Sequence, residues 1–409
     1  MNYKIHFVPQ NLSGEIHLPF SKSISNRLLV IHAFTKQAFK IFNLSESDDT
    51  HYMNQAFKST EDMVNIGHAG TAMRFLTAYF AAASIKKTIT GSERMKNRPI
   101  GELVNALNSI GAGIEYAGNP GYPPLITSGK PLQGNEISLK GSVSSQYITA
   151  LLLIAPVLPK GLTINITDKL ISSSYVKLTL EMMKYFEVES YWIGNKIVIP
   201  HQQYKANDYT VEADWSGASY WYQLAFLADS ADLTLHGLFK DSAQGDVAIS
   251  DLFETIGVKT SFNGEKLQMQ KIETDCKIFE FDFINNPDMV QTFVVALCLK
   301  GIPFKLTGAQ SLRIKETDRI AALQTEMNKL GFLISEPEVG TLTWDGNKNP
   351  FQTNIRIETY DDHRMALAFA PAAIHYPGLI IMDAGVVSKS YPNYWDDLRS
   401  IGAIIEPVD

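Results

Sequence analysis

The 409-residue sequence has only two cysteines, and its nine histidines show no paired metal-ligand spacing such as His-Glu-x-x-His. Neither Cys276 nor Cys298 lies in a metal-binding or redox motif. Cys298 falls in an apolar stretch over residues 289–299, which predicts a small buried hydrophobe within a helix. We therefore expect neither a metal site nor a redox centre.

Long apolar runs and an excess of positive charge are also missing. No run approaches the roughly 18 to 20 residues of a membrane span, and the alternating pattern around Lys4 and His6 indicates a strand instead of a signal peptide. With 36 Lys and Arg against 43 Asp and Glu, the net charge is -7, and no basic stripe suggests nucleic acid or membrane binding. We expect a cytoplasmic protein with more than one domain and a large core.

Positive charge is instead concentrated in short motifs rich in hydroxyl groups and glycine. Gly67 to Arg74 contains two glycines and a threonine and precedes the apolar run from Phe75 to Ala83. This order is typical of an anion-binding loop before a helix, whose first amides have no partner within the helix. An ordinary glycine-rich loop is the alternative for this motif taken alone.

Similar clusters recur along the chain. Ser21 to Arg27 opens an apolar helix in which Ser23 and Arg27 lie one turn apart on one face, and Ser144 to Gln146 opens another helix over residues 147–155. The remaining cations are Arg94 and Arg98 flanking a polar loop, Lys315 and Arg319 at helical i,i+4 spacing, Arg364 starting a helix through residue 373, and Lys389 in a late loop. Each cluster alone would be a solvated face. Together they indicate one anionic site assembled from the whole chain.

A repeat organises the sequence. Five predicted helices end in an apolar residue followed by glycine or phenylalanine at residues 111, 186, 257, 331 and 402, at intervals of 75, 71, 74 and 71. Alternating residues follow, as over 258–269 and 332–344, and predict hairpins. From the end of the predicted helix over residues 49–57 to Gly111, the interval is about 20 residues shorter than this period. About 20 residues is the length of one hairpin. We infer that the first unit has lost its hairpin; the alternative is that it belongs to no repeat.

Six motifs give the chain a resemblance to a known family over nearly its full length. They are Leu18-Pro19-x-Ser21-Lys22-Ser23-x-Ser25-Asn26-Arg27, Ala69-Gly70-Thr71-Ala72-Met73-Arg74, Arg94-Met95-Lys96-x-Arg98-Pro99-Ile100, Gly141-Ser142-Val143-Ser144-Ser145-Gln146, Arg313-x-Lys315-Glu316-Thr317-Asp318-Arg319 and Asp362-His363-Arg364-Met365-Ala366. The chain resembles the enolpyruvyl transferase family, and within it the members that act on shikimate 3-phosphate.

The resemblance implies a mixed α/β (α+β) fold with two lobes, each built of three βαβαββ repeats, the first repeat being shortened. One lobe would comprise residues 1–19 and 214–409, and the other residues 20–213, with hinges near Phe20 and Asp214 and the active site between the lobes. It also implies a monomer that uses no metal or cofactor and binds two small anionic substrates.

The implied reaction transfers the enolpyruvyl group of phosphoenolpyruvate to the 5-hydroxyl of shikimate 3-phosphate and releases phosphate, in the shikimate pathway to chorismate and the aromatic amino acids. The shikimate 3-phosphate site would use Lys22, Ser23, Arg27, Ser144, Ser145, Gln146, Ser172, Asp288, Ser311 and Lys315. The phosphoenolpyruvate site would use Lys22, Gly70, Arg94, Gln146, Arg319, Arg364 and Lys389. Two phosphates and two carboxylates in one cleft account for this many cations.

By the same resemblance, Asp288 would take the proton of the 5-hydroxyl, Glu316 would supply a proton to the methylene carbon, and Lys22 would join them as a catalytic residue. Structural roles are the alternatives. Asp288 follows Asn286-Pro287 and suits the first turn of a helix, and Glu316 could pair with Arg319 at i,i+3. Ser144 and Ser145 are also possible helix caps, and His363 is either a core histidine or a catalytic one.

Three residues depart from the family pattern: Phe20 replaces a glycine, His68 an asparagine and Phe75 a proline. Two other functions remain open. One is a UDP-N-acetylglucosamine enolpyruvyl transferase, which normally has a cysteine in the loop equivalent to residues 91–99, where this chain has none. The other is a non-catalytic anion-binding protein on the same fold, which the presence of both carboxylates disfavours.

Overall fold

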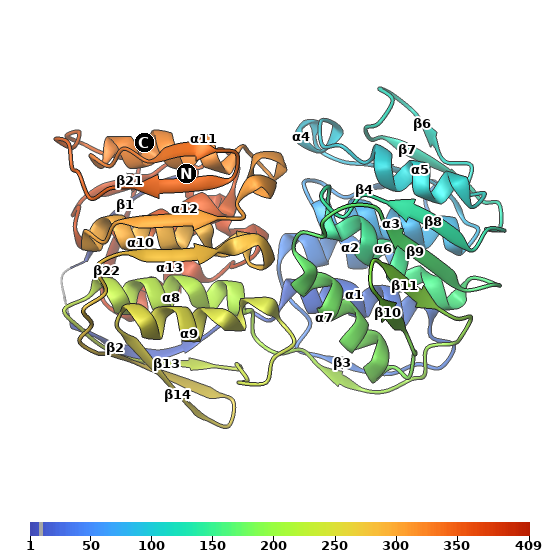
Figure 1. Ribbon diagram of the computed structural model, residues 1–409, viewed down its shortest axis with the longest axis horizontal. Helices are drawn as coiled ribbons and strands as arrows, with labels where there is room; N and C mark the ends of the chain where they lie inside the picture. Colours follow the sequence, from blue (N-terminus) through green and yellow to red (C-terminus); the bar gives the residue numbers. More distant parts are fainter. Residues whose placement is uncertain (8–10) are drawn as a thin grey trace. The chain divides into compact units, whose positions relative to one another are not determined.

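The computed structural model describes residues 1–7 and 11–409, which fold into two compact units. Met1–Phe20 and Glu212–Asp409 form the first unit, and Ser21–Val211 forms the second (Figure 1). The resemblance implied boundaries at residues 19/20 and 213/214, whereas the two units divide at residues 20/21 and 211/212. Among the described residues, no helix has both the length and the apolar character needed to cross a membrane.

Two four-stranded sheets of the second unit share one topology. In each, two parallel strands are joined through a helix, and a second helix leads to a hairpin that pairs antiparallel with the second strand. The first sheet, in the order β4-β5-β7-β6, is built from β4 (Met63–Asn65), α3 (Gly70–Ala82), β5 (Lys86–Thr90), α4 (Glu93–Lys96), α5 (Gly101–Ser109), β6 (Glu115–Tyr116) and β7 (Leu125–Ser128). The second, in the order β10-β11-β9-β8, is built from β8 (Glu136–Leu139), α6 (Ser145–Ile154), η1 (Ala155–Val157), β9 (Leu162–Ile166), α7 (Ser173–Tyr185), β10 (Tyr191–Ile193) and β11 (Lys196–Ile199).

The third sheet of this unit is shorter. Here β3 (Ile41–Phe42) pairs in parallel with β12 (Tyr209–Thr210), and the sheet has two strands within the described chain. Its helices are α1 (Lys22–Phe34) and α2 (Asp48–Lys58), and the described residues between α2 and β4 form no hairpin. The prediction that the first repeat lacks its hairpin is therefore confirmed.

The first unit contains three four-stranded sheets with the same βαβαββ pattern. Their strands are β2 (Asn11–His17), β13 (Ser230–His236), β14 (Val258–Asn263) and β15 (Lys266–Lys271); β16 (Phe279–Asp282), β17 (Phe304–Thr307), β18 (Ser335–Glu338) and β19 (Thr341–Trp344); and β20 (Arg356–Ile357), β21 (Leu379–Ile381), β1 (Asn2–Phe7) and β22 (Ala403–Val408). Their helices are α8 (Trp215–Leu227), η2 (Gly245–Ala248), α9 (Ile249–Ile256), η3 (Phe283–Asn285), η4 (Pro287–Met289), α10 (Val290–Lys300), η5 (Gln310–Ile314), α11 (Arg319–Lys329), α12 (His363–Phe369), η6 (Ala370–Ile374), η7 (Ala384–Lys389) and α13 (Tyr394–Ser400).

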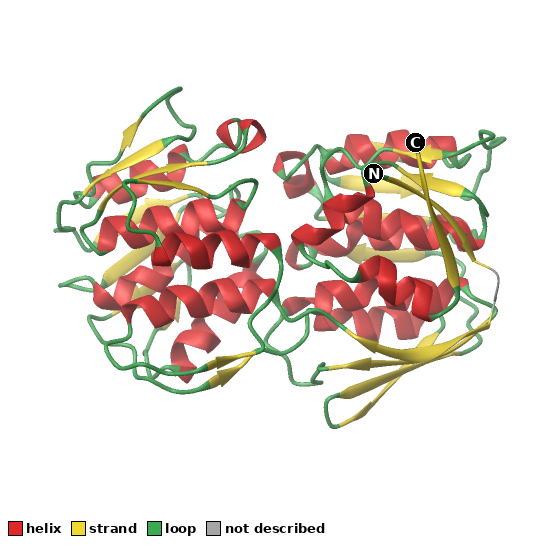
Figure 2. Ribbon diagram, turned by 180° about the vertical axis from the view of Figure 1, so that it is seen from behind, coloured by secondary structure: helices red, strands yellow, loops and turns green. Residues whose placement is uncertain are grey.

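The N-terminal strand completes the last repeat. β1 lies between β21 and β22 and pairs antiparallel with both, so the two ends of the chain share one sheet (Figure 2). The chain passes from one unit to the other twice. The strand before each passage belongs to the unit that the chain then leaves, because β2 pairs in parallel with β13 of the first unit, and β12 with β3 of the second. The crossings therefore run from strand to helix, at Phe20 and Glu212.

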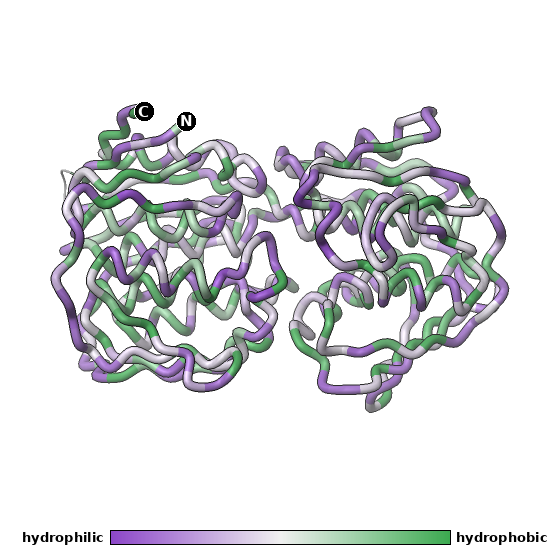
Figure 3. The backbone as a smooth tube through the Cα atoms, turned by 90° about the horizontal axis from the view of Figure 1, so that it is seen from above, coloured by the Kyte–Doolittle hydropathy of each residue, from purple (hydrophilic) through white to green (hydrophobic). Residues whose placement is uncertain are grey.

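Apolar helices form the core of each unit, and hydrophobic residues, green in Figure 3, recur along them. In α8 every residue except Ser216 is buried. In α10, Cys298 is fully buried, as predicted. Helices with so little polar surface are held by packing on all sides, which fixes the loops at their ends.

Candidate functional site

The glycine motif of the second unit opens a helix, as predicted, but the helix begins at Gly70, before the apolar run. Ala69 is the N-cap and has no side-chain acceptor, so the N-cap residue does not cap the first amides. A Cβ atom on Gly70 would collide with the guanidinium of Arg98, which lies against this turn. Gln146 donates its Nε2 to Thr71 Oγ1 at 3.3 Å and joins this turn to α6.

Arg27 is held rigidly on α1. It donates Nε to Thr179 Oγ1 at 2.9 Å, Nη1 to the Ser23 carbonyl at 2.6 Å and Nη2 to the Tyr175 carbonyl at 3.2 Å. Its guanidinium carbon lies 5.8 Å from the centre of the Phe75 ring, a cation–π distance. Burial lowers the pKa of Arg27 to about 10, so the side chain stays cationic at neutral pH.

Lys22 begins α1 and faces a buried carboxylate. Ser21 caps the helix by accepting the amide of Ile24 at 3.5 Å, which confirms the helix start predicted from the motif. Lys22 Nζ lies 3.7 Å from Oδ2 of Asp49, in the first turn of α2. Oδ1 of Asp49 is buried and has no hydrogen-bond partner among the described residues.

The remaining predicted serines of this unit lie at helix starts. Ser144 caps α6 by accepting the amide of Gln146 at 3.3 Å, and Ser145 is the first helical residue. Ser172 is the N-cap of α7, is buried, and has a left-handed backbone with φ 54°. The helix starts therefore fix the backbone positions of these serines, and the Ser144 hydroxyl is also held by its capping hydrogen bond.

The loop predicted between Arg94 and Arg98 is instead a one-turn helix, α4. Ser92 caps it by accepting the amide of Met95 at 3.3 Å, a local hydrogen bond that outweighs the polar composition. The two arginines differ in environment, because Arg94 is exposed whereas Arg98 is buried.

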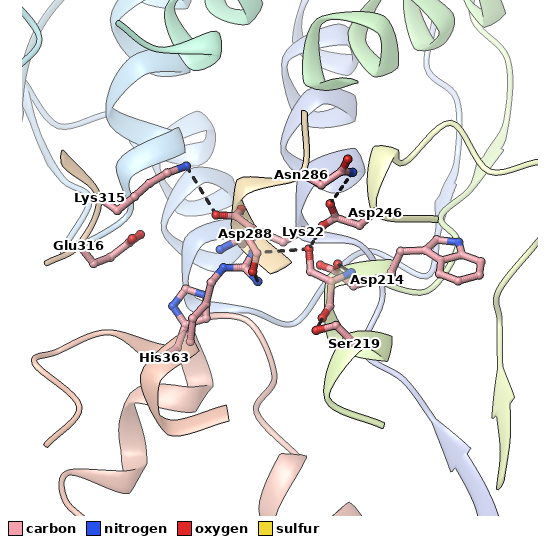
Figure 4. Close-up of polar contacts among 12 residues, drawn as sticks. Lys22, Asp214, Ser219, Asp246, Asn286, Asp288, Lys315, Glu316 and His363 are labelled. Atoms are coloured by element: carbon pink, nitrogen blue, oxygen red, sulfur yellow. Dashed lines mark hydrogen bonds and ion pairs between the residues drawn. The ribbon is translucent and has the colours of Figure 1, made fainter. Parts of the chain in front are cut away.

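In the first unit, Asp288 on η4 is paired with three cations, of which Figure 4 labels Lys315. Its Oδ1 accepts Nη1 of Arg319 at 2.9 Å and lies 3.6 Å from Lys315 Nζ, and its Oδ2 accepts Nη2 of Arg364 at 2.9 Å. Burial alone would raise the pKa of Asp288, but Arg364, Lys315 and Arg319 together hold that pKa well below its usual range. Asp288 is therefore an ionised carboxylate near neutral pH.

Arg319 connects three carboxylates. Besides Asp288, it donates Nη2 to Glu316 Oε2 at 2.8 Å and Nε to Asp362 Oδ2 at 2.7 Å. Although burial opposes the charge, these carboxylates raise the pKa of Arg319 above its usual value. Lys389 at the end of η7 donates to the other oxygen of Glu316 at 3.1 Å. The i,i+3 pairing of Glu316 with Arg319, weighed as a structural alternative, is present.

The helical i,i+4 relation predicted for Lys315 and Arg319 is wrong. α11 begins only at Arg319, because Asp318 acts as its N-cap and accepts the amide of Ala321 at 3.1 Å. Lys315 and Glu316 lie in the connection after η5. The two cations nevertheless meet at Asp288.

Ser311 and His363 lie on elements next to these ion pairs. Ser311 lies in η5, and its hydroxyl oxygen is buried without a hydrogen-bond partner among the described residues. His363 is buried at the start of α12, with Nδ1 3.8 Å from Asp362 Oδ1. Arg364, next along α12, also donates Nη1 to the Asp288 carbonyl at 3.3 Å.

Sequence reasoning gave no role to several residues that contact the predicted ones. Asp362 was part of a motif; it caps α12 by accepting the amide of Arg364 at 2.9 Å and pairs with Arg319. Asp49, Ser216 and Asp246 lie outside the six motifs, and only Asp49, in the first turn of a predicted helix, had any positional signal.

Comparisons with known proteins identify the family of the chain. A family model described as EPSP synthase (3-phosphoshikimate 1-carboxyvinyltransferase) matches residues 8–61 and 55–398. A 3-phosphoshikimate 1-carboxyvinyltransferase of Bacteroides fragilis is 50% identical over 395 residues, with 96% of each chain covered. One of Vibrio atlanticus is 36% identical over 426 residues, with 96% of this chain and 97% of the relative covered.

Solved structures show the same fold. An EPSP synthase from Acinetobacter baumannii aligns with a TM-score of 0.77 and 20% identity over 99% of this chain and 100% of that one. The enolpyruvyl transferase NikO from Streptomyces tendae aligns with a TM-score of 0.73 and 16% identity over 99% and 98%. The family match and the relatives above 30% identity show that this chain belongs to the EPSP synthase (3-phosphoshikimate 1-carboxyvinyltransferase) family.

Proposed function

We propose that the chain transfers the enolpyruvyl group of phosphoenolpyruvate to the 5-hydroxyl of shikimate 3-phosphate and releases phosphate. The observation that carries the proposal is the ionised Asp288, bound by Arg319 and Arg364 and close to Lys315 in a member of this family. A carboxylate that can act as a base and the cations that can bind anionic substrates thus lie in direct contact.

The proposal assigns each substrate a set of residues. Shikimate 3-phosphate binds to Lys22, Ser23, Arg27, Ser144, Ser145, Gln146, Ser172, Asp288, Ser311 and Lys315. Phosphoenolpyruvate binds to Lys22, Gly70, Arg94, Gln146, Arg319, Arg364 and Lys389. The rigid anchoring of Arg27 supports its part, because a preorganised guanidinium loses little entropy when it binds phosphate.

Proton transfer falls to the two carboxylates. Asp288 takes the proton of the 5-hydroxyl as that oxygen bonds to C2 of phosphoenolpyruvate, while Glu316 protonates the methylene carbon. The Glu316 carboxylate then takes a proton back from the methyl carbon as the bond from C2 to the phosphate oxygen breaks, which restores the double bond and releases phosphate. Lys22 neutralises charge on the phosphoenolpyruvate oxygens in the same step.

Substrate anions compete with these carboxylates for the cations. Without ligand, Arg319, Arg364 and Lys389 are already paired with Asp288 or Glu316. At an effective dielectric of ~20, two like charges 4 Å apart repel by about 4 kcal/mol. A bound phosphate or carboxylate therefore weakens the hold of the cations on Asp288 and makes it a stronger base.

The proposal also includes a monomeric, cytoplasmic enzyme that acts on two small anions without a metal, a cofactor, nucleic acid or a membrane. The net charge of -7, with cations gathered at the proposed site, supports small anions over nucleic acid as ligands.

Phosphate release tests the acceptor. The protein should release phosphate from phosphoenolpyruvate when shikimate 3-phosphate is added, and not when UDP-N-acetylglucosamine replaces it. Release with the sugar nucleotide alone would support the UDP-N-acetylglucosamine enolpyruvyl transferase instead, and tight binding of both substrates without release would support a non-catalytic anion-binding protein.

A further inference from the structure

A buried carboxylate outside the six motifs lies beside the ion pairs of the first unit. Asp246 in η2 is 5% exposed and points toward Asn286 (Figure 4). Its Oδ2 accepts the hydroxyl of Ser216 at 2.5 Å, and its Oδ1 lies 3.4 Å from Nδ2 of Asn286. Each carboxylate oxygen therefore contacts a residue that is connected to the proposed site, Ser216 through its side chain and Asn286 through the backbone.

One of these contacts leads to Asp288 along the chain. Asn286 precedes the turn η4 that bears Asp288 and occupies its N-cap position. Its side chain makes no cap hydrogen bond and instead donates to the carbonyl of Gly245 at 2.7 Å, next to Asp246. The turn with the proposed base is thereby attached to η2.

The other contact leads to Asp288 through space. Ser216 Oγ lies 3.5 Å from Nη2 of Arg364, and the same nitrogen donates to Asp288 Oδ2 at 2.9 Å. Asp246, Asn286, Asp288, Arg364 and Ser216 thus form a closed ring of side-chain and chain connections. Moving the Asp246 carboxylate would disturb the base and its cation from two sides.

We propose that Asp246 is a positioning residue, whose carboxylate fixes Asp288 through Asn286 and Arg364 through Ser216. The inference rests on the proposed function, which gives Asp288 its task as a base. Misplacing a reacting group by about 1 Å can cost roughly 100-fold in rate, so an indirect contact of this kind is sufficient to matter.

The charges facing Asp246 make this positioning dependent on pH. Asp288 on η4, Asp214 at the start of α8 and Arg364 on α12 all act on it. Burial and the negative charge of Asp288 raise the pKa of Asp246 to about 6, while the Ser216 hydrogen bond and Arg364 lower it. Below that pH the carboxyl binds a proton, and the ring loses an acceptor.

Two variants test the inference, with the wild type assayed for product from shikimate 3-phosphate and phosphoenolpyruvate between pH 5 and 8. In the wild type, kcat should fall as pH drops through about 6, which gives the pH profile an acid limb. Asp246→Asn should lower kcat about 10- to 100-fold at pH 7.5. It should also lose this acid limb, because an amide does not titrate there. Ser216→Ala is the milder variant. It should move the acid limb to higher pH, because the hydrogen bond that lowers the Asp246 pKa is gone.

Asp397→Asn is the matched control. Asp397 is a half-buried carboxylate that accepts the Tyr391 hydroxyl at 2.7 Å, and burial likewise raises its pKa to about 6, but it lies outside the ring. It should keep the wild-type acid limb and a kcat within about twofold. Equal kcat values and equal pH profiles for Asp246→Asn and Asp397→Asn would overturn the inference. If Asp246→Asn does not fold, an acid limb at the wild-type pH in Ser216→Ala would overturn it. An inactive wild type would overturn the proposed function, and this inference with it.

Discussion

Arg319 donates to Asp288 at 2.9 Å, so a cation proposed for phosphoenolpyruvate is paired with the base proposed for shikimate 3-phosphate. The same arginine donates to the proposed proton donor, Glu316, at 2.8 Å. The two carboxylates are therefore coupled through one side chain before any substrate binds. Their charges, and the positions of their oxygens, depend on which anions the cations hold.

Asp288→Asn keeps the size of the side chain and removes the base. It should lower kcat by roughly 10²- to 10⁴-fold, while the dissociation constant of shikimate 3-phosphate stays within about tenfold. Steady-state kinetics and calorimetry measure the two quantities. Asp282→Asn, an exposed aspartate on the preceding strand β16, should leave both unchanged. A kcat near the wild-type value in Asp288→Asn would remove Asp288 from the mechanism.

Glu316→Gln tests the proton donor in the same way. The amide still accepts a hydrogen bond from Arg319 but cannot protonate the methylene carbon, so kcat should fall by about 10²- to 10⁴-fold. In deuterated water, incorporation of solvent deuterium into the methylene group should slow in parallel. The exposed Glu280 supplies the matched control, Glu280→Gln. If exchange continued at the wild-type rate while turnover fell, another group would be the donor.

The ion pairs of Asp288 should also appear in stability without substrate. Its pKa is lower in the folded than in the unfolded protein, so its charge stabilises the fold above about pH 4, and this contribution is lost as pH falls through the folded pKa. Asp288→Asn should therefore cost about 3 kcal/mol of unfolding free energy at pH 6, and less as pH approaches 3. Urea unfolding at several pH values measures this difference. A difference that grows toward acid pH would contradict the assigned direction of the shift.

Phe75 stands where the family usually has a proline, and its ring lies at a cation–π distance from the guanidinium of Arg27. Phe75→Leu keeps α3 apolar but removes the cation–π contact, worth about 0.5 to 1 kcal/mol. Shikimate 3-phosphate should then bind about two- to fivefold more weakly, with kcat little changed. Phe80→Leu, a buried residue of the same helix, controls for lost packing. Equal weakening in both variants would mean that the ring contributes only to the core.

Sequence alone predicted the features that depend on neighbours along the chain. The helix starts at Ser21 and Ser144 followed from hydroxyl-bearing motifs placed before apolar runs, and the hairpins over 258–269 and 332–344 followed from alternation after a helix end. The missing hairpin of the first repeat followed from a broken period.

Features that depend on contacts through space were not predictable in this way. β3 and β12 are two residues each and pair across more than 160 positions, too short for any periodicity. α4 is a single turn held by one cap. Asp246 reaches the proposed site through Ser216 and Asn286, which are 30 and 40 positions away, so no local spacing could reveal it.

The most direct test of the central claim follows the enolpyruvyl carbons themselves. Phosphoenolpyruvate labelled with carbon-13 at C2 is mixed with shikimate 3-phosphate and the protein, and the products are observed by carbon-13 NMR while phosphate is counted. One labelled enol ether, attached through the 5-oxygen, is expected for every phosphate released. Labelled pyruvate appearing with the phosphate would show hydrolysis instead of transfer and would contradict the proposed function.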